Sequence, residues 1–241
     1  MRRKILAIAI SVMLLAALVA CGSPGAQTDT QTSTQNSGTA DTGQAVADFQ
    51  TDVHNPAAEV TDASEALQYL KDGNRRYVED KGINRDTNAA DRDVLKDGQK
   101  PFAIVLTCSD SRDSPEIYFD QKLGDIFVIR NAGNIADITA LGSMEYAAEH
   151  LHAPLVVVVG HSSCGAVTAA VQGGTFPEAL ESIVNTIKAS IGNETDVDTA
   201  IHTNVDSVVS KIKNDEIAKS QKVTVIGAYY NIVTGEVTWN D

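Results

Sequence analysis

The chain has 241 residues and a formal net charge of −13 at pH 7, with an isoelectric point near 4.7. No basic cluster lies along one face of an expected element, so the charge excludes a nucleic-acid partner. The composition is uneven, because the first 60 residues carry few of the apolar side chains that a packed core needs. We therefore expect one folded domain, over residues 61–241.

The N-terminal segment, residues 1–20, has the order and size of a secretory signal. Three of its first four residues are basic, and Ile5–Val19 is apolar except for one serine. The apolar run is too short for a membrane-spanning helix, which needs about 20 residues. Its end, LVACG, resembles the bacterial lipobox, and this resemblance implies that Cys21 carries a lipid after cleavage. The alternative is an ordinary signal peptide with an incidental cysteine.

Residues 21–60 are dominated by Thr, Gln, Ser, Gly, Ala and Asp. Apolar side chains are too sparse here to offset the entropy cost of ordering the segment. We expect a disordered tether that runs from the lipidated Cys21 to the domain. It would hold the domain at the outer face of the bacterial cytoplasmic membrane, or in the periplasm or at the cell surface. His54, within this tether, is expected to be solvated.

Expected helices and strands alternate along residues 61–241. A helix is predicted from Asp62 to about Glu79, capped by Thr61 or Ser64, followed by a polar loop with one short helix over 82–98. Further helices are predicted at 115–119, 138–151, 166–171, 177–191 and 197–213. Strands are predicted at 102–107, 125–130, 155–159, 222–229 and 236–239, the last two joined as a hairpin. This order predicts an α/β fold, a mainly parallel central β-sheet flanked by helices, with an N-terminal helical arm.

Two apolar runs, 102–107 and 155–159, end in potential metal ligands. Both runs are too short for a helix and rich in Val, Ile and Leu, as in strands covered on both faces of a parallel sheet. The segment CSDSR follows the first run, and GHSSC follows the second. Ligands of parallel sheets gather beyond the carboxyl ends of the strands. One edge of the sheet is therefore expected to hold Cys108, Asp110, Arg112, His161 and Cys164.

Cys108, His161 and Cys164 supply two sulfurs and one nitrogen, the donor atoms that zinc prefers, so the sequence predicts a zinc site. A helix beginning near Gly165 would bring amide donors to the thiolates and favour their deprotonation. The alternative is a Cys108–Cys164 disulfide, because the protein is expected to be exported. A disulfide needs neither a histidine three residues before one cysteine nor an Asp-x-Arg after the other, so the zinc site is favoured.

Asp110 and Arg112 are expected to pair, so that the guanidinium orients the carboxylate. The plain interpretation is a salt bridge. Next to a metal, an oriented carboxylate can also accept a hydrogen bond from bound water and hold that water for attack. Asp110 is equally a candidate fourth zinc ligand, which would exclude the water. The sequence leaves both states open.

These residues resemble the β class of carbonic anhydrases. The family pattern Cys-x-Asp-x-Arg, followed about fifty residues later by His-x-x-Cys, is met at Cys108 and at His161. The similarity extends through EALQYLKDGNRRY, VIRNAGN, GSMEYAAEHL and GAYYNIVTGEV, and so covers nearly all of residues 62–241. The resemblance implies a β-carbonic-anhydrase-like fold.

The resemblance also implies a role for each residue of the two turns. Cys108, His161 and Cys164 would bind zinc, and Asp110 and Arg112 would form a catalytic dyad. A zinc-bound hydroxide would attack carbon dioxide and give bicarbonate and a proton, because zinc lowers the pKa of its water to about 7.

Three further residues match substrate-pocket positions of the family. By the resemblance, Gln99 would donate a hydrogen bond to bicarbonate, while Phe127 and Tyr146 would line an apolar pocket for the gas. Without it, both aromatic residues would be ordinary core residues. The family assembles through paired subunits with pockets at the interface, which implies a homodimer or a higher homo-oligomer.

Some positions depart from the family pattern. Bacterial members gated by bicarbonate carry a tryptophan three residues before the first cysteine, where this chain has Val105. The single tryptophan is Trp239, so the ungated form is expected. Asp113 follows the dyad arginine, where many members have an apolar residue, and leaves the strength of the dyad open. His150 and His152 are expected to be surface or packing residues rather than a second metal site.

The leading prediction is a lipid-anchored, zinc-dependent carbonate dehydratase, a lyase that interconverts carbon dioxide and bicarbonate outside the cytoplasm. A related enzyme that hydrolyses carbon disulfide or carbonyl sulfide would use the same metal site, because those gases are also small, linear and apolar. From another class comes a non-catalytic exported binding module, with a Cys108–Cys164 disulfide or a purely structural zinc. Zinc content and thiol titration discriminate that module from the enzymes.

Overall fold

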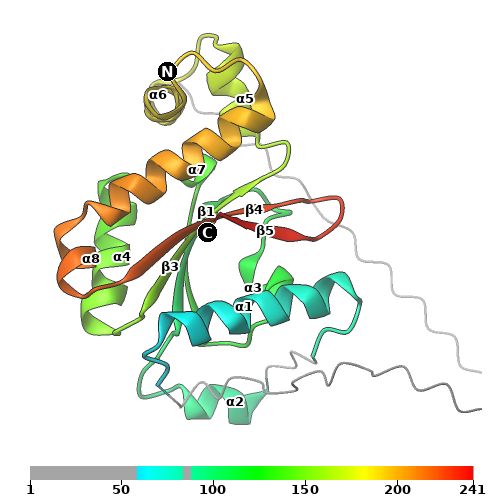
Figure 1. The fold of residues 1–241 in the computed structure, drawn as a ribbon, viewed down its shortest axis with the longest axis vertical. Coiled ribbons are helices and arrows are strands. Elements are labelled where there is room, and N and C mark those ends of the chain that lie inside the picture. The colour runs from blue at the N-terminus through cyan, green and yellow to red at the C-terminus, as the bar shows by residue number, and fades with distance from the viewer. Residues whose placement is uncertain (1–58, 84–87, 241) are drawn as a thin grey trace, which may run out of the picture. The chain divides into compact units, whose positions relative to one another are not determined.

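The computed structural model describes residues 59–83 and 88–240 (Figure 1). The predicted signal peptide, Cys21, His54 and nearly all of the tether lie outside the described residues. In the described part, five strands form one sheet in the order β2-β1-β3-β4-β5. The strands are β1 (Ala103–Cys108), β2 (Ile126–Asn131), β3 (Leu155–His161), β4 (Thr224–Tyr230) and β5 (Val237–Asn240). The first four strands are parallel and β5 is antiparallel to β4, which confirms the mainly parallel sheet.

Helices cover both faces of the sheet (Figure 1). One face packs against α1 (Ala63–Val78) and α3 (Pro115–Tyr118). The other packs against α4 (Ile138–His150), α7 (Val197–Lys213) and α8 (Glu216–Ser220). Beyond the carboxyl ends of the strands, α5 (Gly165–Gln172) and α6 (Glu178–Ile191) pack beside α7 and the short 3-10 turn η1 (Ala132–Asn134). The remaining helix is α2 (Ala89–Val94).

The two central strands are apolar throughout because both of their faces are covered. Every residue of β1 and β3 is buried. Alternate side chains go to opposite faces: Val105 packs among the side chains of α1 and α3, whereas Ile104 and Leu106 pack among those of α4 and α7. This explains why neither strand shows the alternating pattern of a half-exposed strand.

The structure corrects two details of the expected helices. Asp62 caps α1, not Thr61 or Ser64: its side chain accepts hydrogen bonds from the amides of Ser64 and Glu65. A carboxylate is among the strongest N-caps. The helix α8 was not expected, because five residues are too few to show helical periodicity; its cap is the side chain of Asp215.

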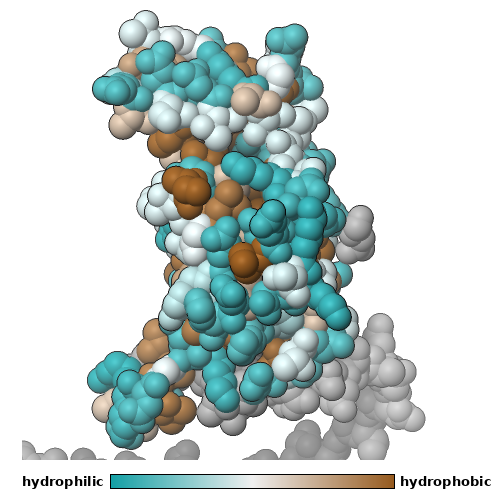
Figure 2. Space-filling view, turned by 90° about the vertical axis from the view of Figure 1, so that its left-hand side faces the viewer, coloured by the Kyte–Doolittle hydropathy of each residue, from teal (hydrophilic) through white to brown (hydrophobic). Residues whose placement is uncertain are grey.

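The outer face combines hydrophilic residues with separate apolar patches, as Figure 2 shows for one side of the molecule. Ile138 and Val233 are the most exposed of the large apolar residues, at 85% and 90%. Among the described residues, no helix combines the length and the hydrophobicity that a membrane span requires.

A buried asparagine joins α1 to the rest of the domain. Asn74 donates hydrogen bonds from Nδ2 to the carbonyls of Tyr118 (3.0 Å) and Gly235 (2.8 Å). Its Oδ1 accepts a hydrogen bond from the amide of Val237 at 2.9 Å. One side chain therefore links α1 both to α3 and to the turn between β4 and β5.

Replacing Asn74 with alanine is expected to lower the free energy of unfolding by about 2 to 4 kcal/mol, because three buried backbone groups lose their partner. Urea denaturation followed by circular dichroism measures this change. Asn214→Ala is the control, since its exposed side chain bonds only within its own helix end; it should change the free energy by less than about 0.5 kcal/mol. Equal effects of the two substitutions would contradict the role given to Asn74.

Candidate metal centre

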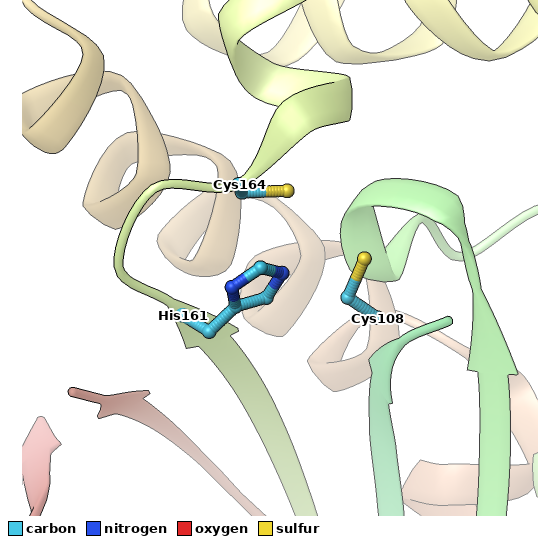
Figure 3. Close-up of side chains that lie close together, drawn as sticks. All are labelled: Cys108, His161 and Cys164. Carbon is cyan, nitrogen blue, oxygen red and sulfur yellow. The ribbon is translucent and has the colours of Figure 1, made fainter. Parts of the chain in front are cut away.

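Three metal-binding side chains meet at the carboxyl edge of the sheet (Figure 3). Cys108 is the last residue of β1, His161 is the last residue of β3, and Cys164 directly precedes α5. The two strands are adjacent and parallel, so their ends reach the same edge. One ligand atom from each residue lies within 4.8 Å of the others, and all three residues are buried. A tetrahedral zinc needs its ligand atoms about 4 Å apart, so the spacing suits this metal.

The histidine presents the correct nitrogen to the cysteines. Its Nδ1 lies 3.0 Å from the carbonyl oxygen of Ser162. A carbonyl only accepts hydrogen bonds, so Nδ1 carries the proton and Nε2 keeps its lone pair. Nε2 is buried and has no hydrogen-bond partner among the described residues. A metal-binding histidine is normally oriented in this way, by a hydrogen bond from its other nitrogen.

Both cysteines are free thiols in the structure. The contact with Cys164 lowers the pKa of Cys108 to about 4, aided by His161 and by the amides of Gly133 and Asp110, and opposed by burial. The same contact raises the pKa of Cys164, although amides at the start of α5 act in the opposite direction. Zinc binds thiolates, so the contact between the two sulfurs already favours the charge state that the metal needs at Cys108.

A left-handed glycine places an amide on the first sulfur. The N–H of Gly133 donates to Sγ of Cys108 at 3.3 Å. Gly133 has φ of 72°, and a Cβ atom there would lie 2.5 Å from Cδ1 of Ile187. The sequence analysis gave Gly133 no role in the site. The glycine within the NAGN turn after the second strand was the available signal, because turns with positive φ favour glycine.

Asp110 and Arg112 form a bidentate pair beside the three ligands. Nε of Arg112 donates to Oδ1 of Asp110 at 2.9 Å, and Nη2 donates to Oδ2 at 2.7 Å. The guanidinium holds the pKa of Asp110 well below its usual range. Arg130 supports the main chain of this loop by donating to the carbonyls of Cys108 (3.2 Å) and Asp110 (2.7 Å). In this arrangement Asp110 faces the arginine and is not one of the grouped metal ligands.

The residues predicted for the substrate pocket lie away from the three metal ligands of this subunit. The rings of Phe127, in β2, and Tyr146, in α4, are 6.4 Å apart, and Tyr146 is 49% exposed. In the sheet register, Phe127 lies opposite Ile104, four residues before Cys108, which corresponds to about 13 Å along the strand. Gln99 is exposed in the segment before β1. Their contact with substrate stays a prediction.

The positions that depart from the family pattern have structural roles. Val105 is a buried core residue of β1, and Trp239 stacks on Phe119 with ring centroids 5.7 Å apart. His150 contacts the ring of Tyr146 on the surface. Over residues 59–83 and 88–240, no second group of three histidine, cysteine or acidic side chains is placed to hold a metal.

Asp113 does not join the dyad. Its side chain is fully buried and accepts hydrogen bonds from the Thr107 hydroxyl at 2.6 Å and from the amide of Cys108 at 3.2 Å. In the sequence this carboxylate directly follows Arg112. The structure shows that it turns away from the dyad and contacts Thr107 and Cys108 at the end of β1.

Comparisons with known proteins agree with this site. A family model described as carbonic anhydrase matches residues 103–237. Carbonic anhydrase 2 of Mycobacterium tuberculosis is 44% identical over 130 residues, which cover 52% of this chain and 63% of that protein. The carbonic anhydrase of Mycolicibacterium smegmatis is 37% identical over 186 residues, which cover 71% of this chain and 90% of that protein.

A solved structure shows the same fold. One of two tetrameric β-carbonic anhydrases from Sordaria macrospora superposes with a TM-score of 0.58 at 25% identity, and the match covers 73% of this chain and 96% of that one. The chain spans less than two thirds of the length of the M. tuberculosis protein that it matches. The sequence motifs, the metal-binding group and these matches agree, and the chain belongs to the β class of the carbonic anhydrase family.

Proposed function

We propose that this protein catalyses the reversible hydration of carbon dioxide to bicarbonate and a proton, with zinc held by Cys108, His161 and Cys164. One observation carries the proposal: a buried group of two thiols and one oriented imidazole lies at the carboxyl edge of a parallel sheet. The Asp110–Arg112 pair follows the first of these ligands along the chain.

The bound zinc would act as a Lewis acid that supplies a nucleophile near neutral pH. The residues of the chain orient that nucleophile. Arg112 holds the carboxylate plane of Asp110 through two parallel hydrogen bonds, which is the geometry that fixes a carboxylate most firmly. An ionised carboxylate only accepts hydrogen bonds, so Asp110 can take one from the attacking water and direct the oxygen lone pair toward carbon dioxide.

The direct test is stopped-flow hydration of carbon dioxide by the purified protein, with zinc quantified per chain in the same sample. Fast hydration with about one zinc per chain is expected, because the described residues offer one three-ligand group. Zinc without hydration, but with hydrolysis of carbon disulfide or carbonyl sulfide, would assign the site to that reaction instead. A protein that binds no zinc would contradict the proposal.

Removing either sulfur is expected to remove the metal. Cys108→Ala and Cys164→Ala each leave two protein ligands, too few for a stable catalytic zinc site. Both variants should retain less than about a tenth of the wild-type zinc and activity, measured by elemental analysis and stopped-flow assay. Ser109→Ala, the neighbouring exposed residue, is the control and should keep both. A fully active Cys164→Ala protein would refute this ligand assignment.

Asp110→Asn separates metal binding from turnover. The amide is the same size as the carboxylate but presents one N–H₂ group toward the water, so its orienting role is lost. The variant should keep one zinc per chain and lose turnover about 100-fold or more. The pKa of Asp110 lies well below its usual range, so wild-type turnover should show no loss from protonation of this group between pH 5 and 9. Unchanged rates in zinc-loaded Asp110→Asn would rule out the role, with Asp97→Asn as the surface control.

We also propose that the protein is a homodimer or a higher homo-oligomer. The strand β2 is at the edge of the sheet. Phe127, in this strand, is half-buried, and Tyr146, in α4, is exposed. In an assembly, these two rings and Gln99 would complete a substrate pocket at the subunit interface. The related enzymes of Sordaria macrospora are tetrameric, which supports the proposal.

The N-terminal sequence supports a proposed location outside the cytoplasm. A basic start, an apolar run and the LVACG ending are together typical of a lipoprotein signal. We propose that Cys21 carries the lipid and that residues 21–60 tether the domain to a membrane. The domain would then lie at the outer face of the bacterial cytoplasmic membrane, in the periplasm or at the cell surface.

A further inference from the structure

The strand that carries the first metal ligand loses a backbone partner just before its end. Pairing of β1 with β3 stops at Leu106 and Val158, whereas pairing with β2 continues to Cys108 and Asn131. The two central strands thus part where the ligands emerge. Any amide of β1 that points toward β3 beyond Leu106 needs another acceptor, because a buried N–H without a partner is costly.

The amide of Cys108 is such a group. The next amide, that of Ser109, donates to the carbonyl of Asn131 on the β2 side at 3.1 Å. Successive amides of a strand point to opposite sides, so the amide of Cys108 points toward β3. There it meets Oδ2 of Asp113 at 3.2 Å, and the same oxygen accepts the hydroxyl of Thr107 at 2.6 Å. The Thr107 hydroxyl also lies 3.3 Å from the carbonyl of Val159 in β3.

The carboxylate therefore bridges the parting strands. Through the amide of Cys108 it holds the end of β1, and its second donor, the Thr107 hydroxyl, lies beside the Val159 carbonyl of β3. Its own backbone amide donates to the carbonyl of Asp110 at 3.0 Å, which closes the loop that carries the dyad. One buried residue thus contacts the main chain of a metal ligand and that of the dyad aspartate.

The burial of this carboxylate calls for a compensating role. Asp113 is 0% exposed. The two nearby arginines have other partners, since Arg112 is paired with Asp110, and Arg130 donates to main-chain carbonyls. A buried acid without a cation is expensive. An apolar residue here would avoid that cost but would leave the Cys108 amide without this acceptor.

We propose that Asp113 is a positioning residue of the metal centre, which holds the backbone of Cys108 and the loop to Asp110 in place relative to His161. It acts through main-chain hydrogen bonds and touches neither metal nor substrate. The proposal rests on the zinc-dependent function proposed above. Outer-shell residues that orient metal ligands typically contribute 10-fold to 100-fold in metal affinity.

The test measures zinc affinity of the full-length protein by chelator competition and the thiolate charge-transfer spectrum of its cobalt(II) form. Asp113→Ala should weaken zinc binding about 10-fold or more and alter the cobalt spectrum. Asp113→Asn keeps an oxygen that can accept both hydrogen bonds, so it should restore affinity to within about threefold of wild type. Asp125→Ala is the matched control: it also removes a buried aspartate, 1% exposed, which accepts a hydrogen bond from the amide of Lys122.

A general loss of stability would affect Asp113→Ala and Asp125→Ala alike, and equal zinc affinities in these two variants would overturn the proposal. If Asp113→Ala does not fold, Thr107→Val removes the hydroxyl that anchors the carboxylate. It should show a smaller loss of affinity, and wild-type affinity in that variant would also overturn the proposal.

A metal-independent measurement distinguishes failure of this inference from failure of the zinc assignment. In metal-free protein, alkylation of Cys108 by iodoacetamide should be at least about fivefold faster in Asp113→Ala than in Asp125→Ala, because the loop is no longer held closed. If wild type binds no zinc, the proposed function fails while this rate still tests the position of Cys108. Equal alkylation rates would then reject the role of Asp113.

Discussion

The separation of β1 from β3 is the constraint on which the metal centre depends. Up to Leu106 the two strands are bound by a regular parallel ladder, and both are fully buried. Beyond that point each strand supplies a ligand instead of a backbone partner, Cys108 from one and His161 from the other. The buried ladder fixes the two strands up to that point, and beyond it their ligand atoms, with that of Cys164, lie within 4.8 Å of one another. A site on mobile loops would not fix donor atoms as closely.

The site also separates two charges that lie close in sequence. Asp110 is held by a guanidinium near the surface, where its side chain is 18% exposed, and it remains ionised. Asp113, three residues later, is fully buried and accepts hydrogen bonds from neutral donors. The first carboxylate is available to a reacting molecule, and the second is not. In the proposed function, the same residue type would orient the reacting water at position 110, whereas at position 113 it is a buried hydrogen-bond acceptor.

Much of this arrangement could be predicted from residue order. Parallel strands rich in Val and Ile, each ending in Cys or His, must deliver those residues to one edge, so the metal-binding group followed from spacing alone. The bonds that depend on side-chain direction could not be predicted in this way. The pattern of the sequence does not say that Gly133 donates to a sulfur or that Asp62, rather than Thr61, caps α1, because neighbouring residues offer the same chemistry there.

Asp113 illustrates that limit best. As a sequence position it is the residue after the dyad arginine, and its charge suggests an effect on that pair. The fold turns it inward, because the Cys108 amide lacks a strand partner on the β3 side and a carboxylate oxygen is the nearest acceptor. The sequence suggests that Asp113 disturbs the dyad. The structure shows instead that Asp113 serves the end of β1, where pairing with β3 has stopped. The way in which the first ligand is held thus follows from the point at which the β1–β3 ladder ends.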